Sequence, residues 1–171
     1  MAIDKIQSES INLADNFAFT GTVTGAGGNN TPAFKAYVSS GMTIATGTLT
    51  KVTYQTEMYD TDNAFDNSSN YRFTPQTSGK YFFSSKVRLE GTGFTSLALR
   101  IIKNGSSDYT FPNVIFGSNH TTYYDTYQLS GVLEANGSSD YFETFISQNS
   151  GGNLSLSASF GTSFEAFKII T

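Results

Sequence analysis

The residues best suited to chemistry are three carboxylates in one polar loop, Asp60, Asp62 and Asp66. Carboxylate oxygens are hard ligands of the kind that calcium takes in proteins. The loop lacks the order of an EF-hand, because Phe65 and Tyr71 stand where that motif needs glycine and glutamate. Two interpretations remain: a calcium site whose ligands are unassigned, or carboxylates that cap turns by accepting hydrogen bonds from nearby backbone N–H groups.

Catalytic chemistry is not indicated by the remaining side chains. His120 is the single histidine of the chain, and there is no cysteine. A lone loop histidine among serines does not form the nucleophile–base arrangement that covalent catalysis needs. Neither a nucleophile elbow nor a phosphate-binding loop occurs. A glycan depolymerase would need carboxylates at a defined separation, which a loop does not supply. We therefore predict a protein that is not an enzyme and has no cofactor beyond the calcium considered above.

Three tyrosines flank turn-rich stretches and are candidates for surface recognition: Tyr109, Tyr123 and Tyr124. Tyrosine next to Asn and Ser forms a rigid, amphipathic surface that suits glycans or proteins. Strand-edge tyrosines also pack on neighbouring subunits. Both interpretations of these three residues stay open.

The composition limits the classes of partner. A length of 171 residues fits one domain with a short appendage. The formal charge is −4 and no Lys/Arg stripe occurs, so nucleic acid is not expected as a partner. The first residues, MAIDK, do not begin a signal peptide, because no apolar core follows a basic start. No apolar run is long enough for a membrane helix, so membrane insertion is not expected either. If the protein acts outside the cell without such a signal, release by lysis as part of a virus particle is one way for it to leave.

Strict alternation of apolar and polar residues recurs along most of the chain. The stretches 81–89, 97–101, 127–133 and 154–160 each place apolar side chains on one parity. In the first of them, Tyr81 and Phe83 are expected on one face of the strand and Phe82 on the opposite face. Turn signals such as Asn-Gly at 104–105 and 136–137 separate them. In the last stretch, Phe160 shares the parity of Leu154 and Leu156 and is expected on the same face. Many short strands with regular turns predict an all-β, two-sheet antiparallel sandwich.

The first segment of the chain has a different character. It is an extended ribbon whose apolar residues share one parity: Ile11, Leu13, Phe17, Phe19 and Val23. A Gly/Asn-rich stretch that predicts a hinge follows it. A lone ribbon cannot bury its own apolar face, so it must lie on the head domain, its symmetry mates or another protein. We predict an anchoring arm at 1–28, a hinge at 29–31 and a head domain at 32–171.

Several stretches of the head together resemble a known family. The pair YRFTP (71–75) and GKYFF (79–83) carries its most specific motif, and PAFKAY (32–37), ALRIIKNG (98–105), QLSGVLE (128–134) and FGTSFEAF (160–167) fit further strands. This order resembles the globular head of complement component 1q, whose relatives include the tumour necrosis factor (TNF) jelly rolls. The resemblance implies an antiparallel jelly roll, a homotrimer with aromatic residues at its axis, and a binding role without catalysis. The sequence departs from the family in a longer turn at 136–140 and in the absence of a collagen-like stalk.

The arm carries a second resemblance. Residues 15–26 (DNFAFTGTVTGA) look like leader segments of structural proteins from tailed phages. The sequence therefore predicts a phage virion protein, located in the virion and attached by its arm to a capsid or tail-fibre protein. Its trimeric head would display a surface for attachment to a host protein or glycan. The alternative is a free, secreted, lectin-like recognition protein of the same fold.

Overall fold

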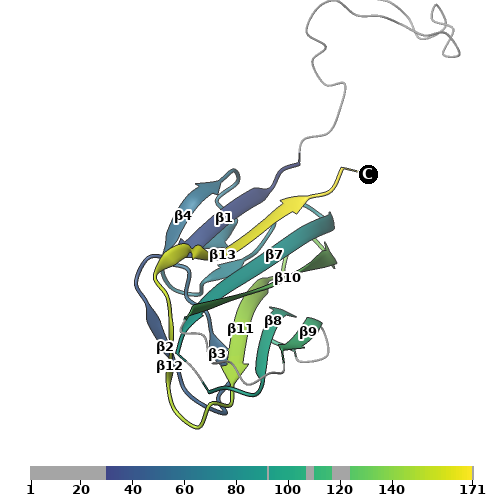
Figure 1. Ribbon diagram of the computed structural model, residues 1–171. Coiled ribbons are helices and arrows are strands. Elements are labelled where there is room, and N and C mark those ends of the chain that lie inside the picture. Colours follow the sequence, from purple (N-terminus) through teal and green to yellow (C-terminus); the bar gives the residue numbers. More distant parts are fainter. Residues whose placement is uncertain (1–29, 92, 107–109, 117–123, 171) are drawn as a thin grey trace, which may run out of the picture.

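The computed structural model describes residues 30–170 except 92, 107–109 and 117–123. Two antiparallel sheets face each other in this part of the chain (Figure 1). The first sheet has seven strands: β1 (Ala33–Val38), β2 (Met42–Ile44), β4 (Thr56–Asp60), β7 (Gly79–Glu90), β10 (Tyr124–Ala135), β12 (Leu154–Leu156) and β13 (Ser159–Lys168). Its main order is β4-β1-β13-β7-β10, with β12 and β2 continuing beside one end of β7.

The second sheet has six strands: β3 (Thr50–Lys51), β5 (Phe65–Asp66), β6 (Arg72–Phe73), β8 (Leu97–Lys103), β9 (Thr110–Phe116) and β11 (Phe142–Gln148). Its order is β5-β6-β11-β8-β9, and β3 pairs with β11. Within the described ranges only strands, bridges, turns and bends occur, and no helix there is long and apolar enough to cross a membrane. The predicted all-β, two-sheet jelly roll is thus confirmed.

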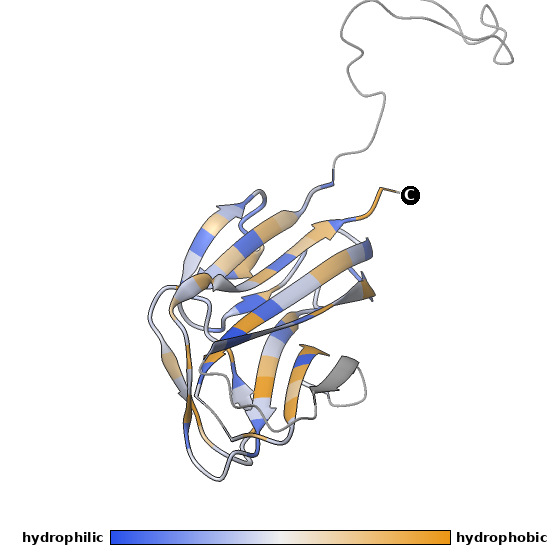
Figure 2. Ribbon diagram, in the orientation of Figure 1, coloured by the Kyte–Doolittle hydropathy of each residue, from blue (hydrophilic) through white to orange (hydrophobic). Residues whose placement is uncertain are grey.

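The predicted alternation places the core side chains of the long strands. On β7, every second residue from Tyr81 to Leu89 is buried, and on β8 Leu97, Leu99 and Ile101 are buried. β10 pairs with β7 over its whole length, from Tyr124 opposite Glu90 to Ala135 opposite Gly79. Figure 2 shows the resulting bands of hydrophobic and hydrophilic residues along the strands of both sheets.

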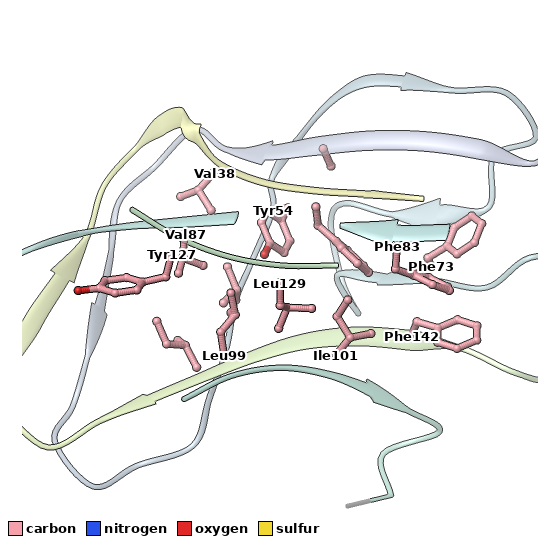
Figure 3. Packing of buried hydrophobic residues seen from close by; sticks show 14 of the residues in the cluster. Val38, Tyr54, Phe73, Phe83, Val87, Leu99, Ile101, Tyr127, Leu129 and Phe142 are labelled. Carbon is pink, nitrogen blue, oxygen red and sulfur yellow. The ribbon is translucent and has the colours of Figure 1, made fainter. Parts of the chain in front are cut away.

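The core between the sheets is rich in aromatic rings. The largest fully buried aromatic side chains are Phe34, Tyr54, Phe73, Tyr81, Phe83, Phe94, Phe142 and Phe164. Phe83 from the first sheet meets Phe142 from the second with ring centroids 4.5 Å apart (Figure 3). The Tyr54 hydroxyl lies 3.1 Å from the Ser85 hydroxyl, and its burial raises the pKa of Tyr54 to about 12. A buried hydroxyl with a partner avoids the cost of an unsatisfied polar group.

The family-like motif at 71–83 is a core element. Phe73 on β6 and Phe83 on β7 point into the same aromatic cluster, with ring centroids 6.1 Å apart. The Tyr81 hydroxyl donates to the carbonyl oxygen of Thr77 at 2.6 Å and braces the turn between β6 and β7. The resemblance therefore rests on residues that build the fold, and these residues are not offered to a ligand.

One strand boundary differs from the prediction. Leu154 and Leu156 are buried as expected, but Phe160 is 64% exposed. β12 ends at Leu156 and β13 begins at Ser159, and the pairing of β1 with β13 shifts register between Tyr37 and Val38. This irregularity breaks the single predicted strand in two and turns Phe160 to the solvent side.

A candidate assembly face on the first sheet

The acidic loop is held by its own backbone. Asp60 Oδ2 accepts a hydrogen bond from the N–H of Phe65 at 2.7 Å. Asp66 Oδ1 accepts from the N–H groups of Ser68 and Ser69 at 3.0 and 2.9 Å. These bonds, led by that of Ser69, lower the pKa of Asp66 below its ordinary range. The carboxylates therefore cap turns in this structure.

Within the described residues, no group of three His, Cys, Asp or Glu side chains is arranged to hold a metal ion. Calcium binding by Asp60, Asp62 and Asp66 remains a prediction. Nearby, the pKa of Glu57 on β4 is raised, by burial first and then by the negative charges of Asp60 and Asp66.

Several sequence-predicted residues lie outside the described part of the chain. They are the arm residues Ile11, Leu13, Phe17, Phe19 and Val23, together with Tyr109, His120 and Tyr123. The division into arm, hinge and head therefore also stays a prediction. Tyr124 is described: it begins β10 and its side chain is 46% exposed.

The outer face of the first sheet, which points away from the second sheet, carries an apolar row near the chain ends. The row crosses four neighbouring strands through register partners: Ala33 opposite Phe167, Phe167 opposite Phe82, and Phe82 opposite Val132. The Phe82 and Phe167 ring centroids are 5.3 Å apart. Phe167 and Val132 are 37% and 45% exposed. A contiguous apolar row on a solvent-side face is a candidate interaction surface.

Polar pairs fill the middle of this outer face. Lys35 Nζ lies 2.6 Å from the Glu165 carboxylate, in the row next to Phe167. Gln128 on β10 donates to the Ser84 hydroxyl on β7 at 3.1 Å. These charges and amides are matched within the sheet. Lys86 on β7 is the register partner of Gln128 and adds a positive charge, so the middle of the face is polar and charged.

A second aromatic group lies at the opposite end of the outer face. The Tyr37 and Phe160 ring centroids are 4.6 Å apart, and these two residues line a recess of about 420 Å³ with Val38 and Ala158. On the neighbouring strands, the Arg88 guanidinium carbon lies 4.5 Å from the centroid of the Tyr124 ring. The predicted recognition residue Tyr124 therefore belongs to this face.

Sequence reasoning did not identify the face as a unit. Phe82 was expected on the solvent-facing side of its strand, which is correct. Its neighbours Phe167 and Val132 come from strands that are adjacent in the sheet but distant in the sequence. Phe160 was assigned to the opposite side. The signal available in the sequence was the occurrence of large apolar residues at wet positions of β7, β10 and β13.

Comparison with solved structures defines the class of fold. A crystal structure of murine APRIL at pH 5.0 has a TM-score of 0.61 and 16% sequence identity, covering 80% of this chain and 98% of that chain. The structure of Eiger TNF from S. frugiperda has a TM-score of 0.58 and 11% identity, covering 80% and 91%. The chain therefore has the fold of the TNF-like jelly rolls. No protein-family model matches its sequence, and no curated protein matches it.

Proposed function

We propose that this chain is a non-enzymatic structural protein of a phage particle, built as a homotrimeric jelly-roll head. The observation that carries the assembly is the outer face of the first sheet, where apolar side chains face solvent at both ends of four neighbouring strands. The family-like motifs resemble heads that are trimeric. Three copies that pack through this face remove the exposed apolar surface from water at once.

The arm at 1–28 connects the trimer to the particle. Its apolar residues share one parity, and the chain enters the head at β1, beside the end of β13. The Lys168 N–H donates to the carbonyl oxygen of Pro32 at 3.1 Å, so both ends of the described chain meet at one end of the sandwich. Three arms that leave from one end of a trimer suit attachment to a capsid or tail fibre. The opposite end and the flanks then face the host.

The trimer multiplies weak contacts with a host surface. Three identical sites on one rigid head raise the avidity for a repetitive surface without tight binding at any single site. Host attachment through a glycan or a protein is the role we assign to the displayed surfaces. The second candidate is a free lectin-like recognition protein, which the same fold also suits.

Three measurements test the proposal. Multi-angle light scattering on the full chain is expected to give the mass of a trimer, and a stable monomer would contradict the assembly. Deletion of residues 1–28 is expected to leave a trimer that no longer joins phage particles. If the shortened protein is incorporated normally, the anchoring role is wrong. Electron microscopy of purified particles separates a capsid from a tail location, and absence from every particle favours the lectin-like alternative.

A further inference from the structure

The second sheet has a hollow of about 270 Å³ on its outer face, on the side of the sandwich away from the first sheet. Its floor is formed by two small residues that are register partners, Ala98 on β8 and Ser147 on β11. Leu99 and Ile146, the next pair along, point into the core. The alternation of the strands therefore aims the floor residues outward. Because both side chains are small, the surface sinks between their larger neighbours.

Arg100 supplies a cation to this hollow. It lies two residues after Ala98 on β8, so the two side chains share one face of the sheet. The pairing of β8 with β9 shifts register between Leu99 and Ile101, at the position of Arg100. Register irregularities of this kind, such as β-bulges, change the direction of side chains and are enriched next to functional sites. A guanidinium carries five N–H donors in a planar fork, which fits a carboxylate or phosphate group in a bidentate manner.

The rim of the hollow is braced by hydrogen bonds. Asn149 Oδ1 accepts from the N–H groups of Thr95 and Ser96 at 3.0 and 2.7 Å. The buried Gln148 donates through Nε2 to the carbonyl oxygens of Ile44 and Gly152 at 2.9 and 2.8 Å. Loops that are fixed in this way hold their polar groups in place before a ligand arrives, which lowers the entropic cost of binding.

The chemistry around Arg100 selects an anionic, hydroxyl-rich ligand. Arg100 is the charged residue among the described residues that line the hollow, so the ligand group that meets it there is anionic. Ser96 and Ser147 offer hydroxyls for a sugar. Phe145 is the register partner of Arg100 and provides an adjacent apolar surface for the C–H face of a sugar ring. The volume lies just below the about 300–1,000 Å³ of pockets that enclose a small molecule. It therefore suits one unit of a longer chain.

We propose that this hollow binds one acidic unit of a surface polysaccharide, with the anionic group on the Arg100 guanidinium. The inference rests on the proposed function, because a homotrimer built through the first sheet leaves the second sheet displayed three times. Figure 1 shows β8 and β11 on the side of the molecule away from β1 and β4. The carboxylate of a uronic acid and the phosphate of a polyol phosphate share the required chemistry.

Binding of the full chain to three probes tests the proposal: oligogalacturonate, neutral oligogalactose of equal length, and poly(glycerol phosphate). We expect binding to at least one anionic probe and no measurable binding to oligogalactose. Arg100→Gln is expected to weaken the anionic interaction about tenfold or more, because a charge-assisted hydrogen-bonded pair is lost. Ser147→Gln, which fills the floor without changing charge, is expected to have a similar effect. Arg72→Gln is the matched control, since Arg72 stacks on Tyr141 away from the hollow, and a change within about twofold is expected.

Each outcome decides the matter. Binding of oligogalacturonate alone identifies a carboxylate sugar, and binding of poly(glycerol phosphate) alone identifies a phosphate-bearing polymer. Failure of all three probes, equal binding of oligogalactose, or unchanged affinity in Arg100→Gln would overturn the site. Thermal unfolding of each variant verifies that it is folded. If Arg100→Gln does not fold, Arg100→Lys replaces it in the binding assay, because lysine keeps the positive charge but lacks the planar set of guanidinium N–H donors. Light scattering on the same samples separates the two proposals: a monomer with Arg100-dependent binding overturns the assembly alone, and a trimer without it overturns this site alone.

Discussion

Phe82 on β7 and Phe167 on β13 are register partners whose ring centroids lie 5.3 Å apart on the outer face of the first sheet. A cross-strand aromatic pair stabilises a sheet by about 0.5–1 kcal/mol. That gain does not require the rings to face water, because the same residues pack equally well inside a core. The proposed trimer would cover these rings on the solvent side, together with Val132 and Ala33, which continue the row.

Phe167→Lys is expected to prevent formation of the proposed trimer and to leave a monomer. The substitution places a charge in the middle of the apolar row, and burying an unpaired ammonium at an interface costs far more than the lost contacts. Multi-angle light scattering over a range of protein concentrations measures the change. Leu49→Lys is the control, since Leu49 is 43% exposed and lies outside the strands of the first sheet. A trimer that persists unchanged in Phe167→Lys would remove this face from the assembly.

The sequence was sufficient to predict several of the long strands but not the surface that they form. Alternation within β7 assigned Tyr81 to the core and Phe82 to the wet side, because strand geometry fixes parity within one segment. Which residues lie beside Phe82 depends on register between distant strands, and no local pattern encodes that. Phe160 shows the same limit, since a register irregularity beside it reversed its predicted side. The hollow at Arg100 depends on the pairing of Ala98 with Ser147, which only the folded sheet reveals.

Phe34→Ala is expected to lower the free energy of unfolding by about 3–5 kcal/mol, the usual cost of removing a buried phenylalanine ring. The Phe34 ring centroid lies 4.6 Å from those of both Phe65 and Phe73, so the cavity opens in the middle of the aromatic cluster. Chemical denaturation followed by circular dichroism measures the loss. Leu49→Ala, at an exposed apolar position, is expected to change stability by less than about 0.5 kcal/mol. Equal effects of the two variants would show that Phe34 is not at the centre of the core.

Asp140→Asn is expected to destabilise the head at neutral pH by about 2 kcal/mol, because Lys103 loses its buried partner. Lys103 Nζ lies 2.7 Å from Asp140 Oδ2, and Asn104 donates to Oδ1 at 2.8 Å. Burial alone would raise the pKa of Asp140, but the hydrogen bonds from Lys103, Asn104 and the N–H of Asn136 lower it below its ordinary 3.8.

The lowered pKa sets the direction of the pH dependence. The unfolded chain takes up a proton at Asp140 more readily, so the contribution of this group is fully present above about pH 4 and is lost as the pH falls through the folded pKa. The difference between wild type and Asp140→Asn should therefore shrink below pH 4. Denaturation at several pH values checks this. Glu134→Gln, at an exposed position of β10, is the surface control. A difference that stays constant down to pH 2 would show that the charge of Asp140 is not what stabilises the fold.

Gly137→Ala is expected to cost at least about 1 kcal/mol more than Gly151→Ala. Both glycines have a left-handed backbone, with φ of 71° and 82°, and an alanine in that region costs about 1–2 kcal/mol on conformational grounds alone. At Gly151 a new Cβ meets nothing within 4 Å, whereas at Gly137 it would lie 2.2 Å from the backbone nitrogen of Ser78. The excess therefore measures the close approach of the β10–β11 turn to the turn before β7. Equal losses in the two variants, measured by denaturation, would mean that these turns separate without cost and that the longer 136–140 turn does not brace the end of the sandwich.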